Sequence, residues 1–165
     1  MSKACSQHFS RHRLSSQNQK SQRYVDERDF GFHVPEIIKN NKDALDAYNY
    51  SIKQSNIAYH MILSALNADE SLPEEGRNKT SLENARYVLP NACETSLILK
   101  MNARELFHFF KLRCCNRALT ETREIADEML RLCKEVSPII FEGAGAPCVN
   151  GSCPEGEMGC KNPRK

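Results

Sequence analysis

Side chains able to bind or transform a ligand are concentrated between Arg11 and Arg23, in the segment RHRLSSQNQKSQR. This segment holds three arginines, one histidine, one lysine, three serines and one asparagine, with hardly an apolar side chain between them. Guanidinium groups offer a planar fork of donors to phosphate or carboxylate, and serine hydroxyls add short neutral donors. The composition therefore favours a phosphate-binding site with a nucleotide as its ligand. The alternative is a solvated basic loop without a ligand.

A second polar group lies in the segment NARELFHFFKLR, residues 102–113. Asn102 suits the N-cap of a helix predicted over Ala103 to Leu112. Arg104 and His108 are four residues apart and share one helix face, and Arg113 falls near that face after two and a half turns. One face could therefore present several donors to one ligand. The alternative is that the apolar residues define a packed side and the polar residues only face water.

The elements that position these groups begin with residues 2–10, which suggest the end of a helix without a capping pattern ahead of it. Residues 15–21 form a polar stretch with neither helical nor strand periodicity, and they are predicted to be a loop. Loops on a rigid scaffold are where binding groups concentrate. The polar side chains of the segment 11–23 are therefore expected on a loop.

The clearest helix is predicted from Asn41 to Leu66, where apolar residues recur at intervals of three and four. Residues 67–79 contain proline and glycine among charged residues and are expected to be an exposed connection. Thr80 and Glu83 match a capping box, T-x-x-E, which predicts a short helix beginning there.

Residues 93–101, CETSLILKM, have the length and β-branched content of a strand, although their alternation is imperfect. A last helix is predicted where Ile125, Met129, Leu132 and Val136 form one face before Pro138. Helices outnumber strands, so the expected fold class is α+β, with helices packed on a small, incomplete antiparallel or mixed sheet.

The eight cysteines are many for a chain of 165 residues, and three of them lie in the tail CVNGSCPEGEMGC. We expect a domain over residues 1–142 followed by a Gly/Pro/Cys-rich tail over 143–165. Without an export signal the cysteines are expected to be thiols or metal ligands, not disulfides. Zinc sites use four ligands at tighter spacing, and a fourth is not evident, so reduced thiols and no metal are favoured.

The net charge of +2, from 23 basic and 21 acidic residues, gives no strong field toward nucleic acid or an anionic membrane. No apolar run approaches the roughly 20 residues of a membrane span, and the amino-terminal residues lack the apolar core of a signal peptide. We therefore expect a cytoplasmic protein that binds neither nucleic acid nor membrane.

The spacing R-H-R-x-x-S-x-N-x-x-S-x-R-Y over residues 11–24 resembles the signature of flavin-dependent thymidylate synthases. The block around Asn102, His108 and Arg113 is similar to the second flavin and nucleotide segment of that family. Arg86, in ENARYVLP, resembles a family arginine that precedes Leu-Pro. The three blocks occur in the order expected for the family.

This resemblance implies FAD-dependent synthesis of dTMP from dUMP, with methylenetetrahydrofolate and NADPH as co-substrates. The FAD contacts implied by matched positions are Arg11, His12, Arg13, Gln19, Asn102, Ala103, Arg104 and His108. The dUMP contacts implied in the same way are His8, Arg11, Gln19, Lys20, Ser21, Gln22, Arg23, Arg86 and Arg113.

The catalytic role implied for Arg113 is to face the uracil ring. A fixed positive charge there favours the N3-ionised form and enriches electron density at C5. The resemblance also implies a homotetramer in which neighbouring subunits complete the flavin and nucleotide sites.

Several departures from the family pattern bear on activity. The region that family members carry ahead of this point is missing from the chain, so an amino-terminally truncated member is expected. Gln7 and His8 reverse the usual order, Gln19 stands where Glu is frequent, and the chain has no tryptophan.

Three functions remain open at this point. The first is the flavin enzyme, and the second is a non-catalytic remnant of that family with weak or no nucleotide binding. The third is a small nucleic-acid-binding module that uses residues 11–23, which the near-neutral charge makes the weakest of the three. Copurifying flavin would separate the first two.

Overall fold

The computed structural model describes residues 1–164, which form two compact units. Unit 1 comprises residues 1–6 and 18–97, and unit 2 comprises residues 7–17 and the described residues from 98 to 164. The chain begins with α1 (Lys3–Phe9), where the Ser2 hydroxyl accepts a hydrogen bond from the Cys5 N–H at 3.0 Å. This helix was expected without a cap, and the structure corrects that expectation: Ser2 is the capping residue.

The sheet has two antiparallel strands, β1 (Ser15–Gln19) and β2 (Leu97–Met101), and the division between the units falls within both. The α+β class is therefore confirmed. The loop predicted over residues 15–21 is wrong for its first five residues. Both ends of β1 are only partly buried and its middle is exposed, so the strand has no apolar face that could appear as a period-two pattern. Backbone pairing, which leaves no trace in side-chain polarity, makes it a strand.

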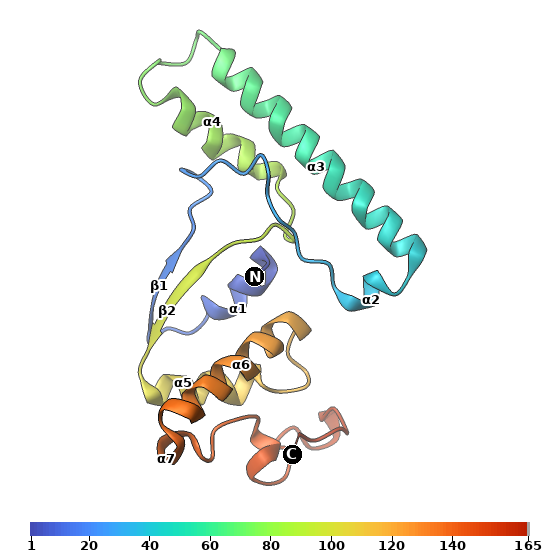
Figure 1. The fold of residues 1–165 in the computed structure, drawn as a ribbon, viewed down its shortest axis with the longest axis vertical. Coiled ribbons are helices and arrows are strands. Elements are labelled where there is room, and N and C mark those ends of the chain that lie inside the picture. Colours follow the sequence, from blue (N-terminus) through green and yellow to red (C-terminus); the bar gives the residue numbers. More distant parts are fainter. Residues whose placement is uncertain (165) are drawn as a thin grey trace. The chain divides into compact units, whose positions relative to one another are not determined.

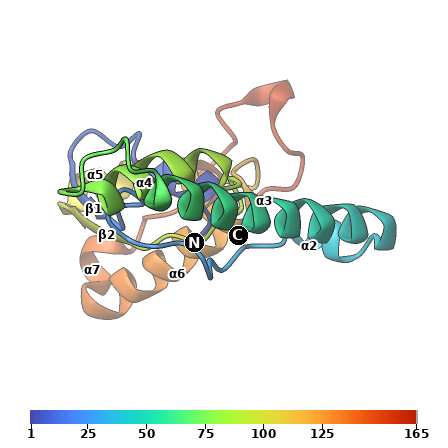
Figure 2. The ribbon, with the colours of Figure 1, turned by 90° about the horizontal axis from the view of Figure 1, so that it is seen from above.

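Unit 1 consists mainly of helices (Figure 1): α2 (Glu36–Lys39), α3 (Lys42–Ala68), α4 (Arg77–Ala85) and the 3-10 turn η1 (Arg86–Val88). The Asn41 side chain accepts a hydrogen bond from the Ala44 N–H at 3.0 Å, and α3 begins there as predicted. Figures 1 and 2 both show α4 running beside α3. Tyr59, Leu63, Leu82 and Ala85 form the buried core between these two helices.

The start of α4 differs from its prediction. Gly76 has φ of 80°, a left-handed conformation that glycine adopts readily, and α4 begins directly after it. The Thr80 N–H donates to the Gly76 carbonyl at 2.9 Å, so Thr80 lies inside the helix and is not its cap. Similarly, β2 is shorter than the strand predicted over 93–101, because Cys93 forms only an isolated bridge with Phe32.

Unit 2 contains α5 (Ala103–Arg113), α6 (Thr120–Val136), α7 (Pro138–Phe141) and the 3-10 turns η2 (Pro147–Asn150) and η3 (Gly156–Met158). The predicted cap of α5 is confirmed, since the Asn102 side chain accepts from the Glu105 N–H at 2.9 Å. Aromatic rings fill the core: the centroids of Phe9 and Phe109 are 5.2 Å apart, and those of Phe107 and Phe141 are 5.5 Å apart.

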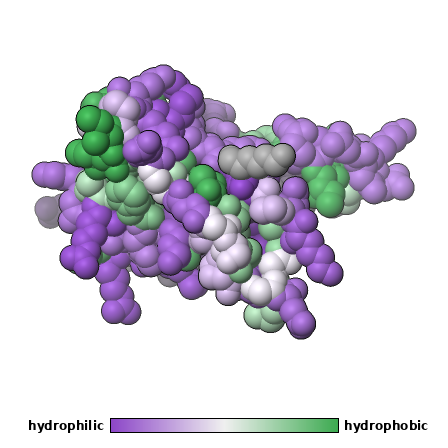
Figure 3. Space-filling view, turned by 90° about the horizontal axis from the view of Figure 1, so that it is seen from below, coloured by the Kyte–Doolittle hydropathy of each residue, from purple (hydrophilic) through white to green (hydrophobic). Residues whose placement is uncertain are grey.

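The surface is mostly hydrophilic on the face drawn in Figure 3, where apolar side chains occur in separate groups. Within residues 1–164, no helix combines the length and apolar character needed to cross a lipid bilayer. The predicted domain boundary at 142/143 lies within unit 2 and stays a prediction.

Candidate functional site

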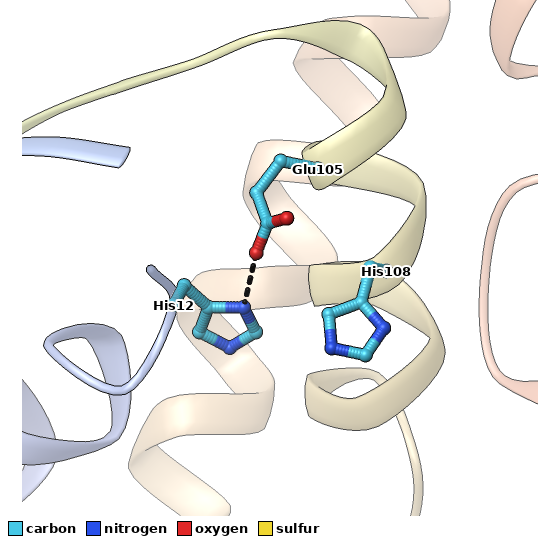
Figure 4. A group of neighbouring side chains, drawn as sticks. All are labelled: His12, Glu105 and His108. Carbon is cyan, nitrogen blue, oxygen red and sulfur yellow. Dashed lines mark hydrogen bonds and ion pairs between the residues drawn. The ribbon is translucent and has the colours of Figure 1, made fainter. Parts of the chain in front are cut away.

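The centre of the site in unit 2 is His12, which lies just after α1 and is 4% exposed. Its Nδ1 atom lies 3.0 Å from Oε1 of Glu105, a buried carboxylate in the first turn of α5 (Figure 4). Its ring also packs edge-on against Phe109, with centroids 5.0 Å apart. The aromatic core and the carboxylate together fix the orientation of the imidazole.

Arg113, at the end of α5, reaches two histidines. Its Nε–H donates to His12 Nε2 at 3.3 Å, and its Nη1 atom lies 3.4 Å from Nδ1 of His8. Because Nε2 of His12 accepts a hydrogen bond from Arg113, the ring hydrogen of neutral His12 belongs on Nδ1, which donates a hydrogen bond to Glu105. Glu105, His12 and Arg113 thus form a continuous hydrogen-bonded chain.

Both histidines are disposed to remain neutral. Burial lowers the pKa of His12, and the adjacent Arg113 guanidinium lowers it further, which outweighs the opposing effect of Glu105. Burial lowers the pKa of His8 as well, with Arg113 and Arg11 contributing in the same direction. Neutral imidazoles can accept hydrogen bonds from the guanidinium, and they add no positive charge beside it.

His108 lies one turn beyond Glu105, and its ring centroid is 5.7 Å from that of His12. One ligand atom from each of His12, Glu105 and His108 lies within 4.8 Å of the others, a grouping that could hold a metal ion (Figure 4). However, both ring nitrogens of His12 are engaged in hydrogen bonds, and the Arg113 guanidinium would repel a cation. The geometry favours a hydrogen-bonded site over a metal centre here.

In unit 1 the basic residues of the first predicted group contact carboxylates. Lys20 Nζ lies 2.8 Å from Glu27, and Arg23 Nη2 lies 2.9 Å from Glu83 on α4. The Arg23 hydrogen bond lowers the pKa of Glu83 and raises that of Arg23. Phosphate binding by these two cations would therefore require an exchange of partners.

The neighbours of Lys20 and Arg23 are also held within unit 1. The amide of Gln19 donates to Ser6 Oγ at 3.0 Å and to Thr95 Oγ1 at 3.3 Å. Arg86 Nε donates to the Glu83 carbonyl at 3.1 Å, so both arginines meet at the same glutamate. This arrangement brings Arg23 and Arg86, two residues of the predicted dUMP set, to one position on α4.

Each unit contains a cavity that includes residues of the predicted site. The unit 1 cavity is about 690 Å³ in volume and is lined in part by Lys20, Glu27 and Arg28. The unit 2 cavity is about 630 Å³, and its lining includes His8 and Arg113. A nucleotide-sized ligand fits within the volume of either.

The predicted site residues differ in exposure. Arg11, Arg13, Asn102, Ala103, Arg104 and His108 are exposed; His8, Gln19, Lys20, Ser21, Gln22, Arg23, Arg86 and Arg113 are half-buried; His12 is buried. In unit 2 the structure brings His8, His12, His108 and Arg113 together, although the sequence spreads them over more than a hundred positions. Arg104 lies on α5 together with His108 and Arg113, but on the exposed surface of that helix.

The residues that sequence reasoning missed are the carboxylates. Glu105 stands three residues after the cap Asn102 and three before His108, so its helical spacing could have indicated a contact. Glu83 was interpreted only as part of a capping box. Glu27 gave no signal, because an acidic residue in a charged stretch is ordinarily solvated, whereas here it is 3% exposed.

Comparison with known proteins places this geometry in context. Residues 1–139 match the family described as thymidylate synthase complementing protein. A flavin-dependent thymidylate synthase from Clostridium tetani is 41% identical over 163 residues, which cover 97% of this chain and 66% of that protein. One from Geobacter sulfurreducens is 44% identical over 160 residues, covering 97% of this chain and 64% of that protein. The chain thus spans slightly under two thirds of the length of these curated relatives.

Proposed function

The chain belongs to the thymidylate synthase complementing protein family, and we propose that it acts in flavin-dependent synthesis of dTMP. The proposed reaction is the reductive methylation of dUMP, with methylenetetrahydrofolate as carbon donor, NADPH as reductant and FAD as cofactor. The proposal is supported by the names of the relatives and by the grouping of His8, His12, His108 and Arg113 in unit 2.

The observation that carries the proposal is the position of Arg113 against two neutral histidines. A guanidinium oriented through two of its nitrogens has a fixed direction, and preorganised charge stabilises developing negative charge without reorganisation. We propose that this charge faces the uracil ring of dUMP, where it favours the N3-anion and makes C5 more nucleophilic. Glu105 acts through His12 as a positioning residue.

The donors in unit 2 fit a flavin dinucleotide. Arg11, Arg13 and Arg104 are exposed guanidinium groups that suit the diphosphate, and Asn102 and His108 add further polar groups. When bound, the flavin would supply the hydride for the transferred carbon. The chain's own contribution would be to bind the dinucleotide and to orient Arg113.

Unit 1 has phosphate-binding groups of its own. We propose that Arg23 can exchange its hydrogen bond with Glu83 for a phosphate group, while Ser21 adds a neutral donor. A phosphate dianion accepts more hydrogen bonds from a guanidinium than one carboxylate oxygen at 2.9 Å does, which favours the exchange.

The test is a titration of the purified full chain, first with FAD and then with dUMP, followed in the visible flavin spectrum. We expect flavin to bind and its spectrum to change when dUMP is added. Arg113→Ala should weaken the dUMP response about 10- to 100-fold, as expected for loss of hydrogen bonds to a charged group. Arg131→Ala is the matched control, because it removes the same charge from the exposed surface of α6 in the same unit.

A folded protein that binds no flavin would contradict this proposal and support the second candidate, a non-catalytic remnant. That candidate is favoured by one observation, that Lys20 and Arg23 of the proposed nucleotide site are already paired with the carboxylates of Glu27 and Glu83. We further propose a homotetramer, which light scattering of the flavin-loaded protein would test. A monomer with full flavin binding would contradict the tetramer alone.

A further inference from the structure

Four of the eight cysteines line the same cavity in unit 2. Cys115 comes from the chain just after α5, and Cys148, Cys153 and Cys160 come from the carboxy-terminal tail. The family match ends at residue 139, so the three tail cysteines lie outside the part that defines the family. The cavity therefore combines a thiol of the family domain with three thiols that the proposed dTMP synthesis does not use.

Hydrogen bonds hold the tail beside Cys115. The side chain of Asn116, the next residue, donates to the carbonyl of Asn162 at 2.7 Å. Arg117 donates to the Glu155 carboxylate at 2.9 Å. Because Asn162 and Glu155 each lie two residues beyond a tail cysteine, these bonds bring two tail segments to the position of Cys115.

Apart from Arg164 near its end, which donates to the Cys114 carbonyl and to Asp127 at 2.7 Å each, the tail has little to stabilise it. It contains no regular helix or strand within residues 142–164, only the short turns η2 and η3. Gly151 and Gly156 have φ of 155° and 53°, and the tail side chains beyond Ala146 are half-buried or exposed. A segment with so small an apolar core gains order from a cross-link that joins distant positions.

The surroundings of the cavity suit thiolates. Lys111, Arg117 and Lys161 line it together with the cysteines, and a metal bound by four thiolates carries net negative charge that such cations offset. The Arg164 N–H also donates to Cys148 Sγ at 3.3 Å, as N–H groups do around metal-bound sulfur. In contrast, the neighbouring Cys114 is buried in the core and does not line the cavity.

We propose that Cys115, Cys148, Cys153 and Cys160 form a tetrathiolate metal centre that fastens the tail to unit 2, with zinc as its metal. Cys115 supplies the fourth ligand that the tail sequence alone lacks. Among residues 1–164 the four sulfurs do not form a group within 4.8 Å, so they draw together when the metal binds. The glycines of the tail lower the conformational free energy needed to bring the four sulfurs together. Zinc binding releases the thiol protons and needs no oxidant or reductant.

The test uses the full chain, reduced, freed of metal by chelation and then titrated with Zn²⁺ alone. We expect one tightly bound zinc per chain, four thiols protected from a thiol reagent, and the visible bands of tetrahedral thiolate-bound cobalt when Co²⁺ replaces zinc. Cys153→Ser and Cys115→Ser should each weaken zinc binding by at least about 100-fold, the upper end of what loss of an outer-shell group costs.

Cys133→Ser is the matched control, since Cys133 lies on α6 in the same unit, is half-buried and does not line the cavity. It should leave zinc affinity unchanged, and circular dichroism checks that each variant keeps its helices.

Metal analysis of the protein as purified identifies what the four thiols bind: zinc, or iron with acid-labile sulfide. Either supports the tetrathiolate centre, and only the former supports zinc as its metal. Zinc binding unaffected by Cys153→Ser and Cys115→Ser, or a tail disulfide in protein without metal, would overturn the proposal.

Discussion

The two units hold their arginines by different chemistry. In unit 1, Arg23 donates to the carboxylate of Glu83, and both side chains are partly exposed to solvent. In unit 2, Arg113 contacts the rings of His8 and His12, and His12 is oriented in turn by the buried Glu105. A partly exposed carboxylate can be replaced by a ligand at low cost, whereas a buried chain of hydrogen bonds fixes a direction. We therefore interpret unit 1 as adaptable and unit 2 as preorganised.

The strongest test of this contrast removes one carboxylate from each unit. Glu105→Ala leaves the Nδ1–H of His12 buried without its acceptor, so we expect it to lower the free energy of unfolding by about 1–3 kcal/mol. Glu83→Ala should have a much smaller effect, because the Arg23 guanidinium can turn to water. Urea denaturation followed by circular dichroism measures both.

Glu105→Gln is the control for the first substitution, because its amide oxygen can still accept from His12. It should recover much of the stability lost in Glu105→Ala. Equal destabilisation by Glu105→Ala and Glu83→Ala would contradict the contrast between a preorganised and an adaptable unit.

A smaller effect is expected at the two asparagine caps. Asn102→Ala and Asn41→Ala each remove one side-chain hydrogen bond to a helix N–H and should each cost about 1 kcal/mol. Only Asn102→Ala should also weaken flavin binding, because α5 carries His108 and Arg113. Denaturation midpoints and the flavin titration check the two parts. Weaker flavin binding in both variants would show that the loss follows general stability and not the position of α5.

The smallest effect concerns pH. The folded-state pKa of His12 and His8 lies below the ordinary value of 6.5, so their contribution to stability is complete above that pH and is lost as the pH falls through it. The folded-state pKa of Glu83 lies below its ordinary 4.5, so the contribution of the Arg23 pair persists until the pH falls below that value.

Amide hydrogen exchange resolved by peptide can follow α5 and α4 separately. We expect protection in α5 to decrease first as the pH is lowered, and that early decrease should be reduced in His12→Asn. Simultaneous loss of protection in α4 and α5 at mildly acidic pH would indicate that the histidines are not the cause.

The fold could be predicted where side-chain periodicity reports burial. The helix expected over 41–66 is α3, and the apolar face from Ile125 to Val136 belongs to α6. The β1 strand could not be predicted, because its pairing is a property of the backbone and its side chains are mostly exposed. The start of α4 depends on the left-handed conformation of Gly76, whereas the sequence showed a clearer capping pattern at Thr80.

Part of the site could also be predicted, because residue spacing indicated which groups share a face. His12, His108 and Arg113 were recognised by spacing, but their contacts depend on Glu105. Its helical spacing indicates neighbours on the same helix and not its hydrogen bond to His12, which lies 93 positions away. The ion pair of Arg23 with Glu83 joins residues sixty positions apart, and a single sequence does not indicate such pairs. Basic groups could thus be identified from sequence, while the carboxylates that orient them required the fold.

Glu105 has two functions in one residue: its N–H donates to the Asn102 side chain that caps α5, and its carboxylate accepts a hydrogen bond from His12. The first residue of α5 and the orientation of the imidazole are therefore set by the same position. Since each residue of an α-helix turns the chain by about 100°, a start shifted by one residue would rotate His108 and Arg113 away from His12. The rotation of α5 about its own axis is therefore fixed relative to His12. We expect a single-residue insertion or deletion between Met101 and Glu105 to abolish the site even where α5 itself still forms.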